Sequence, residues 1–411
     1  MIAVNFLATM TKYPQPAIPT DPILSGATFG YDRGPRMRSV CDAGQVRYVT
    51  SGRVAIGLAL REMRVTTGDQ VLVPAYHSRS MVEPVIWTGA EPVFYRVGMD
   101  TAIDLNDIAT RITPRTRVLM VTNYFGFPQD LVAIRAFCDA HAIRMLEDCA
   151  HGFFGEHAGR PLGSFGDYAI ASSMKFFPLY DGGCLISSRY DLSAVRLVSG
   201  GIKFELKTAI NTLEKGFEYH RMRPLRWLLS LPMVLKNLVW GMLKRGKVVD
   251  AASIAPDSSH GAFTFEEKWL DKRASLMSGL IMRMASVNRI TSARRANYLH
   301  LQAALGSLPG CRPLYPLLPE GVAPWVFPLL TDAPAEVFPA LRNAGVPVVR
   351  FAEFLWDGVD ASVCPASVAL SRRVLQFPCH QELRPAEIDW MVATARRLFL
   401  AGAAAEARVA S

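Results

Sequence analysis

Short apolar runs alternate with longer amphipathic stretches between residues 46 and 190. The short runs are typical of buried strands, and the longer stretches place apolar residues at helical spacing. Helices are predicted over 54–64, 80–90 and 130–142. Because strands alternate with helices, we predict an α/β fold with a mixed, mostly parallel sheet between layers of helices. The predicted strands are "QVLVP" (70–74), "EPVFYRV" (91–97), "RVLMVTNYFG" (117–126), "IRMLEDCA" (143–150), "DYAIASS" (167–173) and "GCLISS" (183–188).

The remaining segments complete a predicted two-domain organisation. Residues 1–45 form a Pro- and Gly-rich arm without a regular pattern. The large domain is predicted to span 46–265, including a basic, apolar insert at about 200–265. Residues 266–305 have the pattern of one long helix, and the stretch from about 320 predicts strand, helix and strand. We therefore predict that 266–411 form the long helix and a small C-terminal α+β domain.

The composition is that of a globular protein with a large core. Of 411 residues, 50% are hydrophobic and 20% are charged, which excludes a disordered chain. The seven cysteines show no C-x-x-C pair and no metal-ligand spacing, so free thiols in a reducing compartment are expected. No apolar run reaches the ~18 residues of a spanning helix. These features predict a cytoplasmic location and no metal site.

Much of the positive charge lies in one segment. The formal net charge of +9 is by itself compatible with nucleic acid, anionic membranes or anionic small substrates. Residues 221–249 contain seven basic residues and no acidic one, interleaved with Trp227, Trp240 and several leucines. One interpretation is an inserted helical pair that packs on the large domain. The other is a kinked, surface-lying hairpin that contacts anionic lipid at the inner face of the membrane.

Chemically active residue types follow the predicted strands. In sheets of this class, ligands bind beyond the carboxyl ends of the strands. One edge of the predicted sheet therefore collects a carboxylate, imidazoles, a lysine and the start of a helix. The residues at this edge are Ser51, Gly52 and Arg53, Tyr76 and His77, Asn123 and Tyr124, Asp148 and His151, and Ser172 to Lys175.

Lys175 is the most informative of these residues because it interrupts an apolar stretch, "MKFFPL". Lysine is rarely buried unless it is paired or used covalently. A lysine amine forms a Schiff base with the aldehyde of pyridoxal phosphate, an aspartate keeps the pyridine nitrogen protonated, and a helix start binds the phosphate. Lys175, Asp148 and residues 51–53 meet these three needs. From the residues alone, a structural lysine and a capping aspartate remain open.

The same region resembles the DegT/DnrJ/EryC1/StrS family. The segments "TSGRVAIGLAL", "GDQVLVPAYHS", "LEDCAHGFFGEHAGRPLGSFGDYAIASSMK" and "DGG" occur in the order of the family, and "EDCAH" with a lysine before "DGG" is a specific combination. The resemblance is good from about 46 to 190 and fainter from about 270 to 400. It implies a fold-type-I pyridoxal phosphate enzyme, in most members an aminotransferase that acts on nucleotide-linked keto sugars.

The resemblance assigns roles around the cofactor ring. Lys175 matches the lysine that carries the cofactor, and Asp148 matches the aspartate on the pyridinium nitrogen. His151 matches the Gln or His beside the ring hydroxyl. The aromatic residue that usually stacks on the ring aligns with a serine here, so His77 or Tyr76 is expected to cover the ring.

The resemblance also implies a phosphate site. Ser172 matches a serine that binds the phosphate. Gly52 and Arg53, preceded by Ser51, match the Gly-Thr pair whose backbone amides hold it. Arg53 departs from the usual Thr and either adds a charge to the phosphate site or points elsewhere. The loop from Ser172 to the lysine is two residues shorter than the commonest form, and the Asn motif between subunits is not recognisable.

Together these features predict a pyridoxal-phosphate-dependent aminotransferase. Glutamate is the expected amino donor, and a nucleotide-linked or other keto sugar in glycan or secondary-metabolite biosynthesis is the expected acceptor. The resemblance implies a homodimer, and no nucleic-acid partner is predicted. One alternative is a dehydratase of the family, although those enzymes carry histidine in place of Lys175. The other is a non-catalytic, membrane-associated member. A nicotinamide enzyme is disfavoured because no G-x-G-x-x-G follows the first strand.

Overall fold

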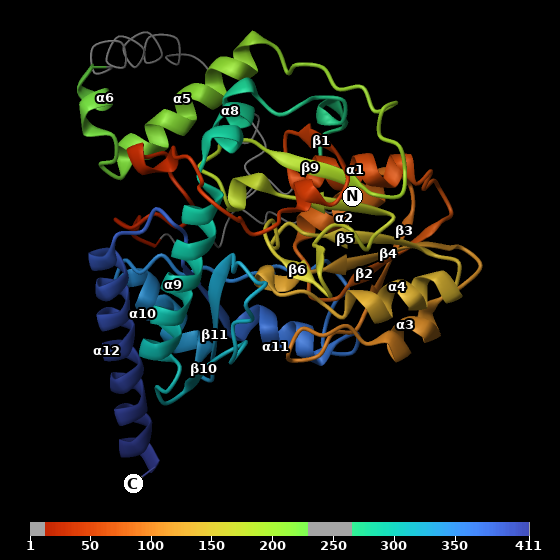
Figure 1. Ribbon diagram of the computed structural model, residues 1–411. Helices are drawn as coiled ribbons and strands as arrows, with labels where there is room; N and C mark the ends of the chain where they lie inside the picture. Colours follow the sequence, from red (N-terminus) through yellow and green to blue (C-terminus); the bar gives the residue numbers. More distant parts are fainter. Residues whose placement is uncertain (1–12, 229–264, 411) are drawn as a thin grey trace, which may run out of the picture.

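The structure is a computed structural model that describes residues 13–228 and 265–410 (Figure 1). A seven-stranded sheet forms its centre, in the spatial order β1-β9-β8-β5-β4-β2-β3. The six strands predicted from apolar runs are all confirmed, and β1 is an additional strand. The strands are β1 (Gln45–Val49), β2 (Gln70–Pro74), β3 (Glu91–Tyr95), β4 (Thr116–Thr122), β5 (Arg144–Asp148), β8 (Tyr168–Ala171) and β9 (Gly183–Ser187).

Most neighbouring strands of this large sheet run parallel. β2 pairs in parallel with β3 and β4, β4 pairs with β5, and β5 pairs with β8. β9 runs antiparallel to both of its neighbours, β8 and β1. Parallel strands need crossover connections, so helices return the chain between them. This mixed, mostly parallel sheet between helices confirms the predicted fold class.

The central strands are buried on both faces. Val71 and Val73 of β2 belong to one apolar cluster, whereas Leu72 belongs to the other. Leu119 and Met120 of β4 are divided in the same way. Successive side chains of a strand point to opposite faces, so burial on both sides explains why these strands are nearly continuous apolar runs in the sequence.

Helices cover the two faces. Apolar side chains of α1 and α2 join the cluster on one face, and those of α4 join the cluster on the other. The Asp130 side chain begins α4 by accepting a hydrogen bond from the Ala133 amide at 3.1 Å. The helices of this part of the chain are α1 (Gly52–Glu62), α2 (Arg79–Trp87), α3 (Leu105–Arg111), α4 (Leu131–Ala140), α5 (Ile202–Glu218) and α6 (Arg223–Leu228).

A second, three-stranded antiparallel sheet forms the C-terminal domain. Its order is β10-β11-β12, and helices pack around it (Figure 1). This arrangement confirms a small C-terminal α+β domain, whereas the boundary near residue 265 stays a prediction. A short hairpin of β6 (Glu156–His157) and β7 (Arg160–Pro161) belongs to neither sheet. The elements of the domain are β10 (Cys311–Pro313), β11 (Val326–Thr331), β12 (Val374–Pro378), α9 (Val287–Leu305), α10 (Pro334–Asn343), α11 (Pro365–Arg373) and α12 (Pro385–Ala410).

The single long helix predicted for 266–305 is wrong. The segment contains a 3-10 turn, then α8 (Leu276–Met284), and then α9. Ser275 and Ser286 begin these two helices, because each hydroxyl accepts a hydrogen bond from the amide three residues later, at 3.2 and 3.1 Å. The apolar spacing continues across Ser286, which is why periodicity alone does not reveal the break.

The N-terminal arm packs on both parts of the molecule. The Val40 amide donates to the Phe153 carbonyl at 2.9 Å, and the Ser25 hydroxyl donates to the Glu382 carboxylate at 2.6 Å. In the insert, α5 and α6 are described, whereas residues 229–264 lie outside the described part of the chain. Among the helices of the described residues, none is long and apolar enough to cross a membrane.

Candidate active site

The carboxyl ends of adjacent parallel strands bring the predicted residues together at one edge of the large sheet. Asp148 is the last residue of β5, and Ser172 directly follows the neighbouring strand β8. A 3-10 turn over Ser173–Lys175 then places Lys175 at the same edge. His151 lies three residues beyond the end of β5. A carboxylate, an amine, an imidazole and hydroxyls therefore share one region, as expected.

The Lys175 amine lies against an aromatic ring. Its Nζ is 4.3 Å from the centre of the Trp325 ring, which comes from the segment just before β11. Burial lowers the pKa of Lys175 to about 8, although the carboxylates of Asp148 and Asp21 act in the opposite direction. An amine with this pKa is about half neutral near pH 8. A neutral amine is what nucleophilic attack or proton transfer requires.

Asp148 is a buried carboxylate with few hydrogen bonds. It accepts one from the Ala150 amide at 2.8 Å and a long one from the Thr122 hydroxyl at 3.5 Å. Burial raises the pKa of Asp148, and the charge of Lys175 opposes this shift. Each of the two groups stabilises the charged form of the other, so the carboxylate and the amine lie within electrostatic reach.

His151 is enclosed by rings. It stacks on Trp325 with ring centres 4.1 Å apart and on Phe125 at 5.8 Å, and the Phe351 ring meets it edge-on at 4.7 Å. The Phe125 amide donates to Nδ1 at 3.3 Å, so this nitrogen carries no proton. Burial lowers the pKa of His151 well below its ordinary value, and the charge of Lys175 acts in the same direction. The ring is therefore neutral, with its proton on Nε2.

The first turn of α1 lies beside Ser172. The Ser51 hydroxyl accepts a hydrogen bond from the Val54 amide at 3.3 Å and begins the helix. A Cβ added to Gly52 would lie 3.5 Å from the Ser172 Cβ, so the two residues are neighbours. At Gly183 a Cβ would lie 2.3 Å from the Ser51 carbonyl carbon, which restricts this position to glycine. The leading amides of a helix lack intrahelical acceptors and attract anions.

Three buried hydroxyls around this helix start have no hydrogen-bond partner within the described chain. They belong to Thr50, Ser172 and Ser173. The Gly182 amide donates to the Thr50 carbonyl at 2.7 Å, and a Cβ on Gly182 would lie 2.4 Å from the Ser173 hydroxyl, so Thr50 and Ser173 are held close together. A buried hydroxyl without a partner is unfavourable. The buried Arg53 side chain belongs to the same turn of α1.

Both ring nitrogens of His77 are hydrogen-bonded to backbone groups. Its Nδ1 donates to the carbonyls of Pro74 and Ala75 at 3.1 and 3.0 Å, and its Nε2 accepts from the Trp356 amide at 3.0 Å. The ring stacks on Phe94 with centres 4.9 Å apart. Burial lowers the pKa of His77 to about 4, so the ring is neutral. A ring-covering role for His77 stays a prediction, and these contacts do not bring His77 into the cluster around Lys175.

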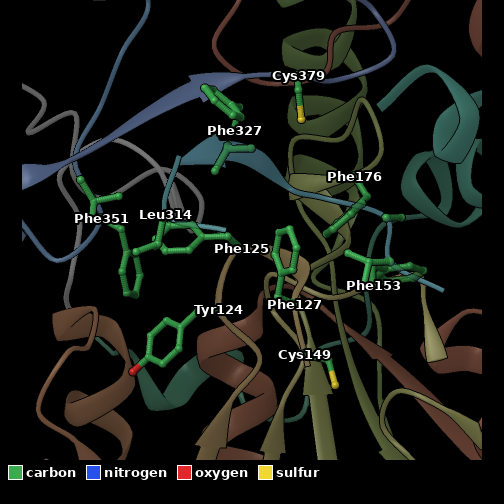
Figure 2. Close-up of a cluster of buried hydrophobic side chains, with 14 of the residues drawn as sticks. Tyr124, Phe125, Phe127, Cys149, Phe153, Phe176, Leu314, Phe327, Phe351 and Cys379 are labelled. Atoms are coloured by element: carbon green, nitrogen blue, oxygen red, sulfur yellow. The ribbon is translucent and has the colours of Figure 1, made fainter. Parts of the chain in front are cut away.

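Tyr76 lies in an aromatic cluster above the sheet edge. It stacks on Tyr124 at 5.3 Å and meets Phe351 edge-on at 5.1 Å. Figure 2 shows Tyr124, Phe125 and Phe351 side by side in this cluster, and the ring centres of Phe125 and Phe351 are 5.9 Å apart. The Tyr76 hydroxyl is buried and has no partner within the described chain. Of the two residues predicted to cover a cofactor ring, Tyr76 is the one that contacts the rings around His151.

Two residues of this region were not identified from the sequence. Glu147 is fully buried, and its carboxylate accepts hydrogen bonds from the amides of Gly163 and Phe165 at 2.8 and 3.1 Å. It thereby fixes the loop that follows β7 next to the end of β5. An acid inside an apolar strand is the signal that identifies it. Trp325 precedes a strand of the other domain, and no local pattern connects it to Lys175.

Comparison with known proteins shows which family this region is similar to. A model of the DegT/DnrJ/EryC1/StrS aminotransferase family matches residues 36–199. The match contains the strand ends, the start of α1 and the lysine turn described above. It confirms the resemblance found in the sequence.

Curated relatives match the same part of the chain. A UDP-N-acetyl-3-dehydro-alpha-D-glucosamine 3-aminotransferase of Acidithiobacillus ferrooxidans is 35% identical over 151 residues, which are 34% of this chain and 40% of that protein. GDP-perosamine synthase of Vibrio cholerae is 30% identical over 143 residues, which are 34% of this chain and 39% of that protein. The aligned stretch thus spans 39–40% of the length of these two relatives.

Solved structures match over most of the chain. A Helicobacter pylori aminotransferase involved in the biosynthesis of pseudoaminic acid gives a TM-score of 0.62 at 14% identity, covering 88% of this chain and 89% of that one. The Bacillus subtilis protein NtdA, solved with bound cofactor PMP, gives 0.59 at 18% identity, covering 87% and 74%. At these identities the likeness establishes the fold alone.

Proposed function

We propose that this chain, whose residues 36–199 belong to the DegT/DnrJ/EryC1/StrS aminotransferase family, is a pyridoxal-phosphate-dependent aminotransferase. The observation that carries the proposal is the buried Lys175 amine within electrostatic reach of Asp148, in the turn that follows Ser172, whose buried hydroxyl has no partner among the described residues. Two relatives named above handle UDP- and GDP-linked sugars. The proposed acceptor is therefore a nucleotide-linked keto sugar, and the proposed donor is glutamate.

The start of α1 fits a phosphate group. The backbone amides of Gly52 and Arg53 lie in the first turn, where a helix attracts anions. The hydroxyl of Ser172 is buried beside this turn and lacks a partner within the described residues. Phosphate oxygens would supply the acceptors that this hydroxyl and the amides need.

The neighbouring residues fit the ring of the cofactor. Asp148 would accept a hydrogen bond from the protonated ring nitrogen, and the neutral His151, with its proton on Nε2, would donate a hydrogen bond to the ring hydroxyl oxygen. Tyr76 would cover the ring in place of the missing aromatic residue. Lys175 would bind the cofactor covalently through Nζ. The burial that holds Asp148 and His151 also keeps water away from these contacts.

The bound cofactor supplies an electron sink for the bond that is broken at the substrate carbon. The chain itself supplies a base for the proton of that carbon. Lys175 Nζ would accept this proton, which requires a neutral amine, and would return it from the resulting ammonium form. Its pKa near 8 keeps a useful fraction neutral at physiological pH, whereas an ordinary lysine is almost fully protonated there. Trp325 contacts the amine and excludes water from it.

Borohydride reduction of the protein loaded with pyridoxal phosphate tests the assignment of the lysine. The pyridoxyl mass is expected on Lys175 after peptide mapping. Lys207 is a matched control, because burial lowers its pKa to about 8 as well. A label on Lys207 would mean that amine basicity alone directs the reaction. That result, or no label, would overturn the proposal.

The substrates need a separate measurement. Loaded protein mixed with glutamate should lose its visible absorbance band and release 2-oxoglutarate in a single turnover. A nucleotide-linked 3-keto or 4-keto sugar should then restore the band and gain one amino group, which mass spectrometry detects. Restoration by 2-oxoglutarate but by no such sugar would place the acceptor in another class.

A homodimer is part of the proposal. α5 and α8 lie side by side at one end of the molecule (Figure 1), and the Leu276 amide donates to the Glu205 carboxylate at 2.8 Å. Both helices expose apolar residues every four positions, which gives each one an apolar stripe. A second copy would cover this surface through a symmetric contact. The exposed residues are Ile202, Leu206 and Ile210 on α5 and Leu276, Leu280 and Met284 on α8.

Peripheral membrane contact through 221–249 is also proposed, although most of this segment lies outside the described residues. Arg221 is not available to lipid, because it is buried and donates to the Glu387 carboxylate at 2.9 Å. The remaining basic residues and the exposed Trp227 support the proposal. The protein should sediment with anionic vesicles at low salt, and less so at high salt. Failure to sediment at low salt would refute the proposal.

A further inference from the structure

Arg294 is a buried cation for which the proposed reaction has no use. It lies on α9, its side chain is 0% exposed, and burial lowers its pKa to about 10. None of its described hydrogen bonds goes to a carboxylate; all of them go to carbonyl or amide oxygens. Burying a charge against neutral acceptors is unfavourable unless the geometry is well satisfied. Its position therefore calls for an explanation.

The guanidinium group joins three segments that are distant in sequence. It donates to the carbonyl of Lys175 at 2.7 Å, to the carbonyl of Trp325 at 2.8 Å, and to the side chain of Gln381 at 3.1 Å. It also lies over the Phe176 ring at 4.5 Å, and Gln381 donates to the Phe176 carbonyl at 2.8 Å. The donors of a guanidinium are fixed in one plane. One rigid group thus sets the distance between the backbones of Lys175 and Trp325.

The side chains on these two backbones meet. Lys175 Nζ lies 4.3 Å from the Trp325 ring centre, and the same ring stacks on His151 at 4.1 Å. Lys175 and His151 lie in segments that follow strands of the large sheet, whereas Trp325 leads into β11 of the C-terminal domain. The contact therefore depends on how the two parts of the molecule are held together.

We propose that Arg294 is a positioning residue that holds the Lys175 amine and the Trp325 ring against each other. It acts through backbone carbonyls and has no described contact with the reacting atoms. The contact exists whether or not the chain is an aminotransferase, but its importance for a reaction rests on the proposed function of Lys175.

The proposal predicts what happens to the amine when Arg294 is removed. The Trp325 ring is released, water reaches Nζ, and the charged form of Lys175 becomes more favourable. The charged or titratable groups that face the amine are Asp148, Asp21 and the neutral His151, and these remain in place. The pKa of Lys175 should therefore rise from about 8 toward the ordinary value of 10.5.

Competitive acetylation of the full chain without cofactor measures this pKa. The protein is treated with trace acetic anhydride from pH 6 to 11, and the label on the Lys175 peptide is read by mass spectrometry. The wild-type midpoint is expected near 8. Arg294→Met should move it upward by at least one pH unit. Arg294→Lys should also move the midpoint upward, because one ammonium group cannot reproduce the pair of hydrogen bonds to the carbonyls of Lys175 and Trp325. If Arg294→Lys keeps the wild-type midpoint, a positive charge at this position is sufficient, and the proposal is overturned.

Arg289→Met is the matched control. Arg289 lies five residues earlier on α9 and binds the Glu382 carboxylate and the Gln381 carbonyl, at 2.6 and 2.8 Å, with no described contact to Lys175. Its removal loosens the same helix and should leave the Lys175 midpoint unchanged. An equal shift in this control would show general loosening and refute the proposal. Labelling of Lys207 in each sample gives an internal reference.

A second variant keeps the proposal testable if the Arg294 variants do not fold. Trp325→Leu removes the ring and keeps the carbonyl that Arg294 binds, and it should raise the Lys175 midpoint. An unchanged midpoint would mean that the ring does not shield the amine, which overturns the proposal. These outcomes are independent of the borohydride experiment. If the protein binds no cofactor, the proposed function is refuted, but the labelling result still tests the role of Arg294.

Discussion

At the level of single residues, the burial of Lys175 links the chemistry of its amine to the stability of the protein. The pKa of this lysine is about 8 in the folded chain and 10.5 in its ordinary state. Between these values the unfolded chain binds a proton that the folded chain does not. The free energy of unfolding therefore increases with pH across this window. Each pKa unit corresponds to about 1.4 kcal/mol, so the gain from this residue is about 3 kcal/mol.

Denaturant titrations of the cofactor-free protein at pH 7.5 and 10.5 measure this gain. Wild type is compared with Lys175→Met, in which the titrating group is absent. The free energy of unfolding of wild type should increase relative to the variant as the pH rises. Other groups that titrate in this range, including Lys207, cancel in the comparison. Parallel pH dependences of the two proteins would show that the amine is solvated in the folded state.

Asp148 has a separable effect on the same amine. Its carboxylate favours the charged form of Lys175, so Asp148→Asn should lower the acetylation midpoint of Lys175 below 8. The variant should also lose at least ~100-fold in turnover, because a neutral amide cannot keep the ring nitrogen protonated. Asp181→Asn is the control. Asp181 is equally buried but binds the hydroxyls of Ser275 and Ser278, both at 2.6 Å. If the Lys175 midpoint stays at 8 in Asp148→Asn, the electrostatic coupling between Asp148 and Lys175 is contradicted.

At the level of elements, two serines beside the start of α1 have different roles. Ser51 is a helix cap, so Ser51→Ala should lower the free energy of unfolding of the cofactor-free protein by about 1 kcal/mol. The Ser172 hydroxyl has no partner among the described residues, so Ser172→Ala should not destabilise that protein. It should instead weaken binding of pyridoxal phosphate by about 10-fold or more, since a hydrogen bond to a charged group contributes about 1.5–3 kcal/mol.

Equilibrium unfolding and cofactor titration of the same three proteins check both expectations. Wild type is compared with Ser51→Ala and Ser172→Ala, each without cofactor for unfolding and with increasing cofactor for binding. Destabilisation by Ser172→Ala would show that its hydroxyl has a structural partner. Unchanged cofactor binding in Ser172→Ala would remove the residue from the phosphate site.

The sequence predicts the elements of the large sheet well because its central strands are buried on both faces. Runs such as 71–74 and 118–121 are then apolar throughout, and every predicted strand is present. The segment 266–305 is harder, because apolar spacing continues through the cap at Ser286. Arg294 is recognisable only after the helix is known. It lies four residues from both Ile290 and Tyr298, on the buried face of α9, where an arginine is unusual.

At the level of the whole molecule, the predicted site is incomplete without the C-terminal domain. Lys175, Asp148, His151 and Ser172 lie at one edge because strands of one sheet end there, and that rule can be applied to the sequence. Trp325 lies directly before β11 of the other sheet. Its contact with Lys175 depends on packing between domains, which the periodicity of the sequence does not reveal. His77 follows the same strand-end rule, yet its ring nitrogens bind backbone groups, which only the tertiary structure reveals.

The assembly of the molecule gives the last prediction. The exposed stripes of α5 and α8 should be buried between two copies, so Leu206→Lys and Leu280→Lys should dissociate the dimer. A lysine in the centre of an apolar contact between copies would lose its hydration without gaining a partner. Sedimentation velocity at micromolar concentration measures the change. Leu317→Lys is the control: Leu317 is 79% exposed, compared with 59% for Leu206, but it belongs to neither stripe. Wild type and the control should sediment as dimers and the two stripe variants as monomers. If wild type is a monomer, or if the stripe variants remain dimers, the α5 and α8 surface is not the interface.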